Sequence, residues 1–350
     1  MQPDWQKFLM DRGAEFENGL VAHYGNLQQE LAVALSGNIL CDLSHYALLE
    51  ISGADARAFL HSQLINDIQS LDADQSQLNA YCNPKGRVIA NFRVFRRDNQ
   101  YYLRYPGELT HSLSKRLGMY IMRSKVELND VSDEFARFGY AGATADKALA
   151  EVVDNIPETV NGVSMHEKLQ IIRVQGITPS YELYGDAATL QGIWEKLDVH
   201  AAPIGAMAWD LIEVLAGIAN IVEKTSEQFV PQMLNYQAIG SLSFTKGCYP
   251  GQEIVARMHY LGKLKKRLYL ARVRSDQPPE VLQALFSDKS ARGAKAGNIV
   301  NVARHPDGDY AVLAVIQISD ADSAAIRLGQ TDGPLLEIQE LPYPVELRSK

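Results

Sequence analysis

Cysteine is scarce in this chain, and its few thiols are not arranged in pairs. The 350 residues contain three cysteines, Cys41, Cys82 and Cys248, and no C-x-x-C motif. An odd number of widely spaced cysteines argues against both a disulfide framework and a zinc ribbon. We therefore expect reduced thiols and no metal site.

Nucleotide-binding glycine motifs and long apolar runs are also missing. Neither G-x-G-x-x-G nor G-x-x-x-x-G-K-[ST] occurs, so no dinucleotide fold or P-loop is indicated. The longest apolar segment, residues 204–222, is interrupted by Asp210 and Glu213 and does not suit a membrane span, which needs ~20 apolar residues. The first residues show no basic leader followed by an apolar stretch. These features predict a cytoplasmic protein that does not enter a membrane.

Positive charge is in deficit. The 34 Lys and Arg residues face 42 Asp and Glu residues, for a net charge of −8. This balance disfavours nucleic-acid binding over the whole surface. One basic run, residues 263–267 (Lys-Leu-Lys-Lys-Arg), could meet a phosphate backbone, or could be a solvated edge strand whose lysines prevent aggregation. Direct nucleic-acid binding therefore stays open.

The chain does have the length and apolar content for several domains. A 350-residue chain with 46% hydrophobic and 22% charged residues is typical of a globular protein with two or three domains. Helical spacings alternate with strand-like alternation, which predicts an α+β protein with largely antiparallel sheets. The expected parts are an N-terminal helical extension (1–38), a first α+β domain (39–130, completed by 204–262), a second α+β domain (131–203) and a C-terminal all-β unit (263–350).

The spacing of apolar residues predicts the individual elements. Helices are expected at 1–35 (a helical pair), 56–64, 108–122, 144–152, 187–197, 204–221 and 252–261, with a possible short helix at 280–286. Strands are expected at 39–51, 77–82, 88–95, 101–105, 125–128, 138–143, 169–174, 181–184, 264–274, 297–302, 310–318 and 335–341.

The greatest density of chemically useful residues lies in residues 245–260, Thr-Lys-Gly-Cys-Tyr-Pro-Gly-Gln-Glu-Ile-Val-Ala-Arg-Met-His-Tyr. The helical spacing that begins at Gln252 puts Cys248 just ahead of a helix N-terminus. The positive end of that helix and the neighbouring Lys246 both favour a thiolate. Cys248 is therefore a candidate reactive thiol with Lys246 as its partner, although a lone cysteine is often a small buried filler. A cysteine hydrolase that uses His259 is disfavoured, because one loop and helix do not fold that imidazole back onto the thiol.

Lys246-Gly-Cys-Tyr-x-Gly-Gln-Glu253 resembles the K-G-C-[FY]-x-G-Q-E signature of the YgfZ-type folate-binding, tRNA-modifying proteins, which are relatives of the glycine-cleavage T-protein, an aminomethyltransferase. The resemblance covers most of the chain from about residue 43. It implies the three-domain ring of the T-protein fold, with two α+β domains and a C-terminal β-barrel. It also implies a folate-binding accessory protein that supports iron–sulfur cluster assembly or repair and tRNA thiolation, with iron–sulfur enzymes as transient partners.

The same resemblance implies the folate site. Tetrahydrofolate would lie between the two α+β domains, where flat aromatic faces suit a pterin ring. Arg257, Lys246 and Arg87 are available to pair with the anionic folate tail. The predicted folate-binding residues are Tyr46, Trp209, Arg257, Gln252 and Glu253.

Two positions depart from the aminomethyltransferases. Where the T-protein carries its catalytic carboxylates this chain has Ala90 and Asn91, and an amide cannot act as a general base. The carboxylate usual just before Ala216 is Leu215. Enzymatic activity is therefore open, with an accessory role favoured. The alternatives are a folate-dependent aminomethyl or methyl transferase, which a transfer assay would detect, and an RNA-binding module using residues 263–267, whose binding would weaken steeply with salt.

Overall fold

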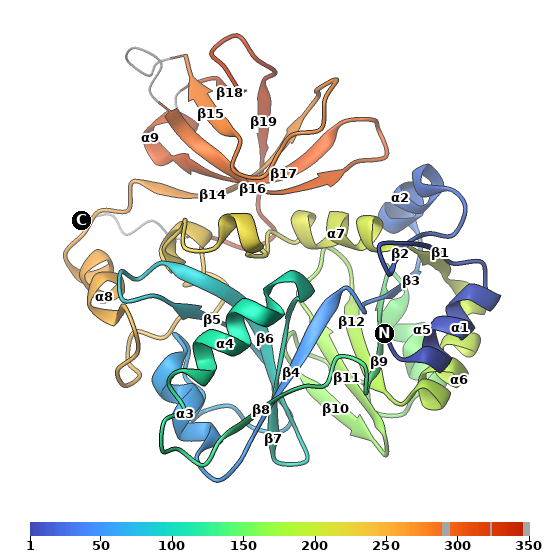
Figure 1. The fold of residues 1–350 in the computed structure, drawn as a ribbon. Coiled ribbons are helices and arrows are strands. Elements are labelled where there is room, and N and C mark those ends of the chain that lie inside the picture. The colour runs from blue at the N-terminus through green and yellow to red at the C-terminus, as the bar shows by residue number, and fades with distance from the viewer. Residues whose placement is uncertain (289–294, 323, 346–350) are drawn as a thin grey trace.

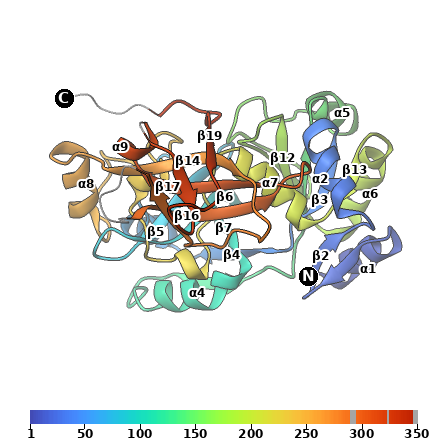
Figure 2. The same cartoon turned by 90° about the horizontal axis from the view of Figure 1, so that it is seen from above.

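The computed structural model describes residues 1–288, 295–322 and 324–345. It contains three sheets of five or six strands and a separate N-terminal hairpin (Figure 1). Helix α7 (Ala206–Leu215) runs between the C-terminal sheet and the two other sheets (Figures 1 and 2). The mixed α+β architecture with mostly antiparallel sheets is the predicted fold class.

The first sheet has the strand order β5-β6-β7-β4-β8 and is entirely antiparallel. Helices α3 (Ala56–Gln63) and α4 (Thr110–Gly118) share a core with it, and the predicted hairpin around residues 83–86 is confirmed. The strands are β4 (Tyr46–Ser52), β5 (Gln77–Cys82), β6 (Val88–Arg97), β7 (Gln100–Pro106) and β8 (Glu127–Asp130).

The second sheet has the order β10-β11-β12-β9-β3-β13, and its β3–β13 pair is parallel. This sheet shares a hydrophobic core around Trp5 and Trp194 with three helices, α1 (Pro3–Asp11), α5 (Ala145–Val152) and α6 (Ala187–Leu197). The strands are β3 (Ile39–Asp42), β9 (Ala136–Ala141), β10 (Val163–His166), β11 (Leu169–Val174), β12 (Ser180–Gly185) and β13 (Ala202–Ile204). Strands β10 and β13 were not predicted.

The single strand predicted at 39–51 is wrong, because β3 and β4 belong to different sheets. Between them, the Asp42 carboxylate accepts hydrogen bonds from the Ser44 backbone N–H, at 3.1 Å, and from the Ser44 hydroxyl, at 2.8 Å. This local turn breaks the apolar run, as Asp side chains commonly do. The crossing places Tyr46, the first residue of β4, at the junction of the two sheets.

The helical pair predicted at 1–35 is also partly wrong. A hairpin of β1 (Glu15–Glu17) and β2 (Leu20–His23) separates α1 from α2 (Leu27–Ser36). Asn18 and Gly19 turn it with φ of 51° and 81°, the left-handed values that an Asn-Gly hairpin turn requires. That dipeptide was a readable signal, but the apolar spacing around it favoured a helix.

The C-terminal sheet curls into a half-barrel with the order β18-β15-β16-β17-β14-β19, and a bridge between Arg327 and Leu335 links its two ends. The possible helix at 280–286 is wrong, since Ala284–Ser287 forms β15 and pairs with strands on both sides. The other elements are β14 (Lys266–Val273), β16 (Lys295–Arg304), β17 (Tyr310–Gln317), β18 (Ile326–Leu328), β19 (Leu336–Gln339) and α9 (Ile318–Ala321).

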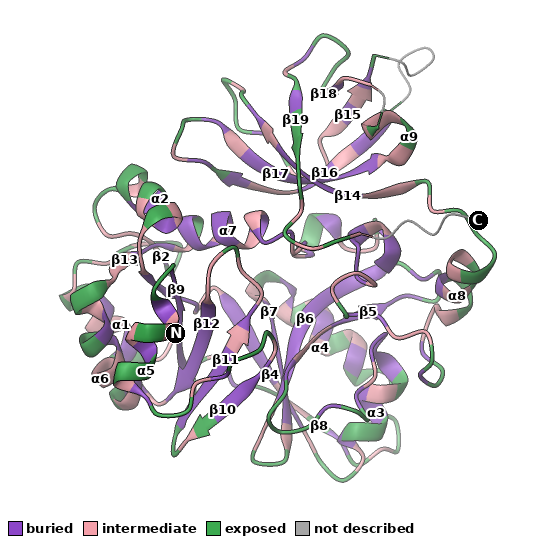
Figure 3. Cartoon of the chain, turned by 180° about the vertical axis from the view of Figure 1, so that it is seen from behind, coloured by how far each residue is buried: buried purple, intermediate pink, exposed green. Residues whose placement is uncertain are grey.

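Helix α7 is shorter than predicted because Gly217, at φ 73°, turns the chain just after it. Among the residues that the structure describes, short 3-10 helices connect other elements at Gly107–Leu109, Asp198–His200, Glu223–Thr225 and Pro231–Leu234. The sheets and α7 are largely buried, whereas α8 (Gln252–Tyr260) lies at the periphery with many exposed residues (Figure 3). Within the described part of the chain, no helix combines the length and apolarity that crossing a membrane requires.

Candidate functional site

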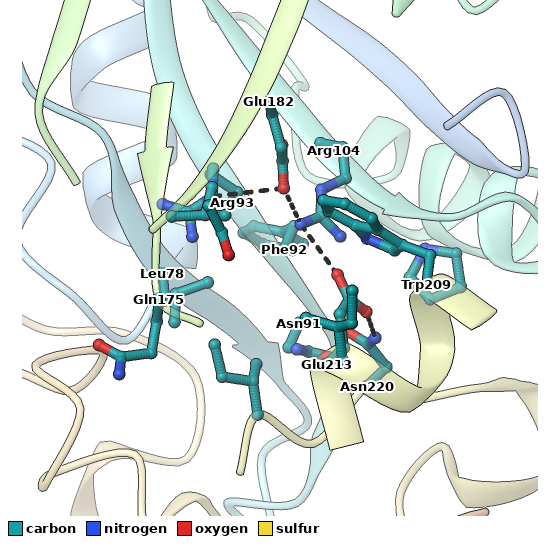
Figure 4. A pocket seen from close by; sticks show the side chains of 15 residues that line it. Leu78, Asn91, Phe92, Arg93, Arg104, Gln175, Glu182, Trp209, Glu213 and Asn220 are labelled. Atoms are coloured by element: carbon teal, nitrogen blue, oxygen red, sulfur yellow. Dashed lines mark hydrogen bonds and ion pairs between the residues drawn. The ribbon is translucent and has the colours of Figure 1, made fainter. Parts of the chain in front are cut away.

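A pocket lies where the first sheet, the second sheet and α7 meet (Figure 4). Its cavity volume is only about 20 Å³. A cavity of this size holds about one water molecule. The lining residues are Leu78, Asn91, Phe92, Arg93, Arg104, Pro106, Val174, Gln175, Ser180, Glu182, Trp209, Ile212, Glu213, Ile218 and Asn220.

Arg104 connects the three elements that build this pocket. Its side chain, on β7, is ion-paired with Glu182 of β12 and lies 3.5 Å from Glu213 of α7. Arg104 is only 7% exposed, so burial alone would lower its pKa, but the two carboxylates outweigh burial and raise it. The guanidinium also lies 4.1 Å from the centre of the Tyr46 ring. One charged group therefore holds both sheets and α7 together.

Glu182 is fully buried and remains ionised because it is surrounded by positive charge. Burial would raise its pKa, but Arg104, and then Arg93 at 4.0 Å, hold it below the usual value. Arg93, also buried, donates hydrogen bonds to Asn161 at 2.7 Å and Ser76 at 3.0 Å. Buried charges are costly unless they are paired in this way.

Tyr46 supports the pocket from behind its lining. Its hydroxyl donates to the Glu213 carboxylate, which also accepts from the Asn220 side chain. Burial, followed by the Glu213 charge, raises the pKa of Tyr46 well above its usual value, so the phenol remains protonated. Asn220 also exchanges two hydrogen bonds with Asn301 of the half-barrel, at 3.1 and 2.9 Å.

Trp209 forms one wall of the pocket and is 1% exposed. Its ring lies so close to Gly139 of β9 that any Cβ at that position would overlap the indole. The indole Nε1 and the Nε atoms of Arg93 and Arg104 have no hydrogen-bond partner among the described residues. Other buried N–H groups of this structure also lack a partner, including Nε1 of Trp194, but these three belong to residues that line one pocket.

Asn91, which stands where the resemblance to the aminomethyltransferases predicts a carboxylate, has a clear structural role. Its side-chain N–H donates to the Ala219 carbonyl at 2.9 Å, and its side-chain oxygen accepts from the Ile221 N–H at 2.7 Å. A carboxylate at this position has no N–H to donate, so it could form only the second of these hydrogen bonds. Asn91 thereby fixes the segment that follows α7.

The predicted reactive thiol lies elsewhere, on a loop formed by residues 243–251, here called the thiol loop. Cys248 is exposed, whereas Cys41 and Cys82 are buried. Lys246 is 8% exposed, and its ammonium donates to the carbonyls of His61 and Leu64 (2.5 Å) at the end of α3. Burial lowers the pKa of Lys246 to about 8.

Helix α8 follows the thiol loop and carries the other signature residues. Gly251 precedes the helix as its N-cap, at φ 82°, where a Cβ would lie 2.5 Å from the Asn83 carbonyl oxygen, so glycine is required. Gln252 donates to the carbonyls of Lys246 and Gly247, both at 3.4 Å. Glu253 and Arg257 are exposed.

The structure thus divides the predicted folate-binding residues into two groups. Trp209 lines the pocket and Tyr46 supports it, whereas Gln252, Glu253 and Arg257 lie on α8 and are absent from its lining. The cations proposed for the folate tail also lie outside the lining: Arg257 is on α8, Lys246 is bound to α3, and Arg87 donates to the Gln228 carbonyl at 2.6 Å. The roles of these residues remain predictions.

Sequence reasoning missed the charges at the centre of the pocket. Each of three charged residues lies between two apolar or aromatic neighbours inside a strand: Arg93, Arg104 and Glu182. A charged residue at an inward-facing strand position signals a buried ion pair, because such residues are almost never buried alone.

Across the described ranges, no cluster of three or more His, Cys, Asp or Glu side chains could hold a metal ion. Of the basic run, Lys263 and Lys265 are exposed, and Arg267 stacks on Tyr269 at 3.9 Å.

Comparison with known proteins defines the class of this fold. Residues 9–239 match the GCVT N-terminal domain family. The structure is similar to that of the glycine cleavage system aminomethyltransferase T from Bartonella henselae, with a TM-score of 0.77 and 15% sequence identity over 97% of this chain and 96% of that one. The chain therefore has the aminomethyltransferase fold, as predicted.

More similar relatives narrow this class. The chain is 30% identical to the tRNA-modifying protein YgfZ of Colwellia psychrerythraea, over 87% of this chain and 93% of the relative. It is 32% identical to the tRNA-modifying protein YgfZ of Yersinia pseudotuberculosis, over 87% and 92% of the two chains. The chain belongs to the YgfZ group of the GCVT family.

Proposed function

We propose that this protein binds tetrahydrofolate in the central pocket and acts as a folate-binding accessory protein in tRNA modification. The observation that carries the folate part is the set of buried polar groups around the pocket, with unpartnered N–H donors on Trp209, Arg93 and Arg104. The names of the relatives support the tRNA part.

The chemistry of the lining suits a pterin. A pterin ring is flat and presents both N–H donors and a carbonyl acceptor on its edge. The carboxylates of Glu182 and Glu213 can accept from such donors, whereas Trp209 and Arg104 can donate to the carbonyl. Small-molecule sites combine apolar walls with a few polar groups in this manner.

The size of the pocket requires that binding moves side chains. A cofactor site usually has about 300–1,000 Å³, and the water-accessible part here is about 20 Å³. Arg104 lies between Glu182 and Glu213, so a movement of Arg104 away from Glu213 is one rearrangement that would enlarge the pocket. Folate would thus replace one partner of Glu213.

Aminomethyl transfer is not part of the proposed function. The carboxylate that the transfer needs is replaced by Asn91, whose amide is engaged by backbone groups on both sides. The contribution to iron–sulfur enzymes, including those that thiolate tRNA, would depend on the exposed thiol of Cys248. Supporting this part is the resemblance of the thiol loop to the YgfZ signature.

The test is a calorimetric titration of the folded protein with tetrahydrofolate, comparing wild type with Trp209→Phe. The substitution keeps an aromatic ring and removes the unpartnered N–H, so affinity should fall by about 2- to 12-fold, the equivalent of one hydrogen bond of ~0.5–1.5 kcal/mol. Trp194→Phe is the matched control, since Trp194 is equally buried but lies in the core beside Trp5. Equal affinity of wild type and Trp209→Phe would place the folate site elsewhere.

A further inference from the structure

Helix α8 and the residues that follow it form a basic surface on an acidic protein. Residues 252–267 contain five lysine and arginine side chains and one acidic side chain, although the whole chain has a net charge of −8. The exposed part, here called the α8 surface, consists of Arg257, Tyr260, Leu261, Lys263 and Lys265. It lies at the periphery, on the side of the molecule away from α5 and α6 (Figures 1 and 2). None of these residues lines the central pocket.

The lysines of the α8 surface do not protect a sheet edge. Strand β14 begins at Lys266 and lies between β17 and β19 in the strand order of the half-barrel. Lys263 and Lys265 therefore precede an internal strand, whereas lysines that prevent aggregation stand on edge strands. The Lys265 carbonyl accepts a hydrogen bond from the Ile318 N–H at 2.9 Å, which anchors the backbone while the side chain stays exposed.

The cations of the α8 surface are not neutralised by neighbouring side chains. Among the described residues, no carboxylate forms an ion pair with Arg257, Lys263 or Lys265. By contrast, a carboxylate pairs with each of several other partly exposed arginines: Arg12, Arg116, Arg173 and Arg272. A group of unpaired cations gives this face a positive potential that attracts an anionic partner.

Three aromatic rings gather beside these cations. Phe244 of the thiol loop stacks on His259 of α8, with 3.5 Å between the ring centres and 17° between the planes. Tyr260 stands nearly perpendicular to His259, at 83°, and is 61% exposed. Leu261, the next residue, is 79% exposed. The α8 surface therefore offers a flat aromatic ring as well as positive charge.

We propose that the α8 surface binds unpaired nucleotides of an RNA. Tyr260 stacks on a base, and the phosphates on either side meet Arg257, Lys263 and Lys265. Proteins that bind single strands combine aromatic side chains with cations along the backbone in this manner. An acidic protein partner would engage the cations but would leave the exposed tyrosine without a role. That the nucleic acid is RNA, and tRNA in particular, rests on the proposed function, whereas binding at this surface does not depend on folate.

The experiment measures the fluorescence anisotropy of a labelled RNA hairpin with an unpaired loop, titrated with the full-length protein between about 50 and 200 mM salt. Wild type should bind this hairpin more tightly than a blunt RNA duplex with the same number of nucleotides, because stacking needs a free base face. Tyr260→Ala should weaken binding of the hairpin by about 5- to 100-fold, the contribution of one stacked base.

The double variant Lys263→Gln, Lys265→Gln tests the phosphate contacts. It should weaken binding of hairpin and duplex alike. It should also reduce the steepness of the plot of log affinity against log salt concentration by about 1.4, since each phosphate contact on a single strand contributes ~0.7. Tyr260→Ala should leave this steepness unchanged, because a tyrosine carries no charge at neutral pH.

The double variant Lys147→Gln, Lys196→Gln is the matched control. It removes the same charge from exposed positions on α5 and α6, far from α8 (Figure 1). Its affinity and salt dependence should equal those of wild type, and a loss as large as that of Lys263→Gln, Lys265→Gln would overturn the proposal.

Two further outcomes decide the identity of the partner. Equal hairpin affinity of wild type and Tyr260→Ala would overturn the proposal and leave the α8 surface to an acidic protein. Tetrahydrofolate titrations of the same variants separate this proposal from the folate pocket, because their folate affinity should equal that of wild type. A wild-type protein that binds the hairpin through Tyr260 but binds no folate would contradict the folate pocket and support the α8 surface.

Discussion

The central pocket and the thiol loop differ in how their chemistry is tied to the fold. In the pocket, Arg104 is paired with both Glu182 and Glu213, and the three residues come from three elements. Arg104 and Glu182 are buried. On the thiol loop, Lys246 donates to backbone carbonyls, and Cys248 is exposed. The pocket is therefore part of what holds the molecule together, whereas the thiol chemistry can be altered without disturbing the fold.

The largest expected effect is the loss of Arg104. Arg104→Leu leaves Glu182 buried without its nearest counter-charge, which should lower the free energy of unfolding by ~3–5 kcal/mol. Urea unfolding at pH 7 measures the change. The double substitution Arg104→Leu, Glu182→Leu is the control and should regain most of the loss, because apolar replacement of a buried pair is often neutral. A loss below ~1 kcal/mol for Arg104→Leu would show that the pocket is not a structural junction.

Asn91→Asp should have the next largest effect. It removes the N–H that donates to the Ala219 carbonyl and faces that carbonyl with an acidic group, which should cost ~1–3 kcal/mol of stability. It should not produce aminomethyl transfer, because the remaining transfer machinery is not restored. Asn99→Asp, at an exposed turn, serves as the control and should be nearly neutral. Turnover of a glycine-derived aminomethyl group by either wild type or Asn91→Asp would contradict the proposed function.

Asp210 should make the stability of the protein depend on pH. Burial, with the Glu213 charge, raises the pKa of Asp210 from 3.8 to about 7. The folded state therefore keeps a proton that the unfolded state has lost, and stability falls as pH rises between these values. Asp210→Asn should remove this loss. A pKa shift is worth ~1.4 kcal/mol per pKa unit, and the partial exposure of Asp210 reduces the effect, so the variant should be more stable than wild type by ~1–2 kcal/mol at pH 7.5. No difference at pH 4 is the internal control, and an equal difference at both pH values would refute the assignment.

Cys248→Ser should have the smallest effect on the fold. An exposed side chain outside any buried network usually changes stability by less than ~0.5 kcal/mol. Tetrahydrofolate affinity should equal that of wild type, whereas the serine variant should fail to restore iron–sulfur enzyme activity or tRNA thiolation in a deletion strain. Full complementation by Cys248→Ser would make the thiol dispensable.

The thiol loop could be predicted from the sequence because its features are contiguous. Lys246, Cys248 and the start of α8 lie within a few residues, and local spacing was enough to place the thiol ahead of a helix. The pocket could be predicted only through Tyr46 and Trp209, and only by resemblance. Its charges are brought together by strand pairing between distant segments, which no local pattern records.

The errors in the predicted elements have a similar origin. The strand at 39–51 was divided by one short turn at Asp42, and the apolar run on both sides hid the change of sheet. The N-terminal hairpin depends on the turn chemistry of Asn18 and Gly19, which competes with apolar spacings that a helix would also satisfy.

Residues 219–221, in the segment after α7, determine how the molecule should unfold. Asn91 of the first sheet is bonded to Ala219 and Ile221, and Asn301 of the half-barrel is bonded to Asn220. If either sheet separated from residues 219–221, this segment would lose hydrogen bonds of its backbone groups while the other sheet still held it in place. The half-barrel and the first sheet should therefore unfold in one cooperative transition rather than as two independent units, and amide hydrogen exchange across residues 219–221 should be as slow as in the central strands.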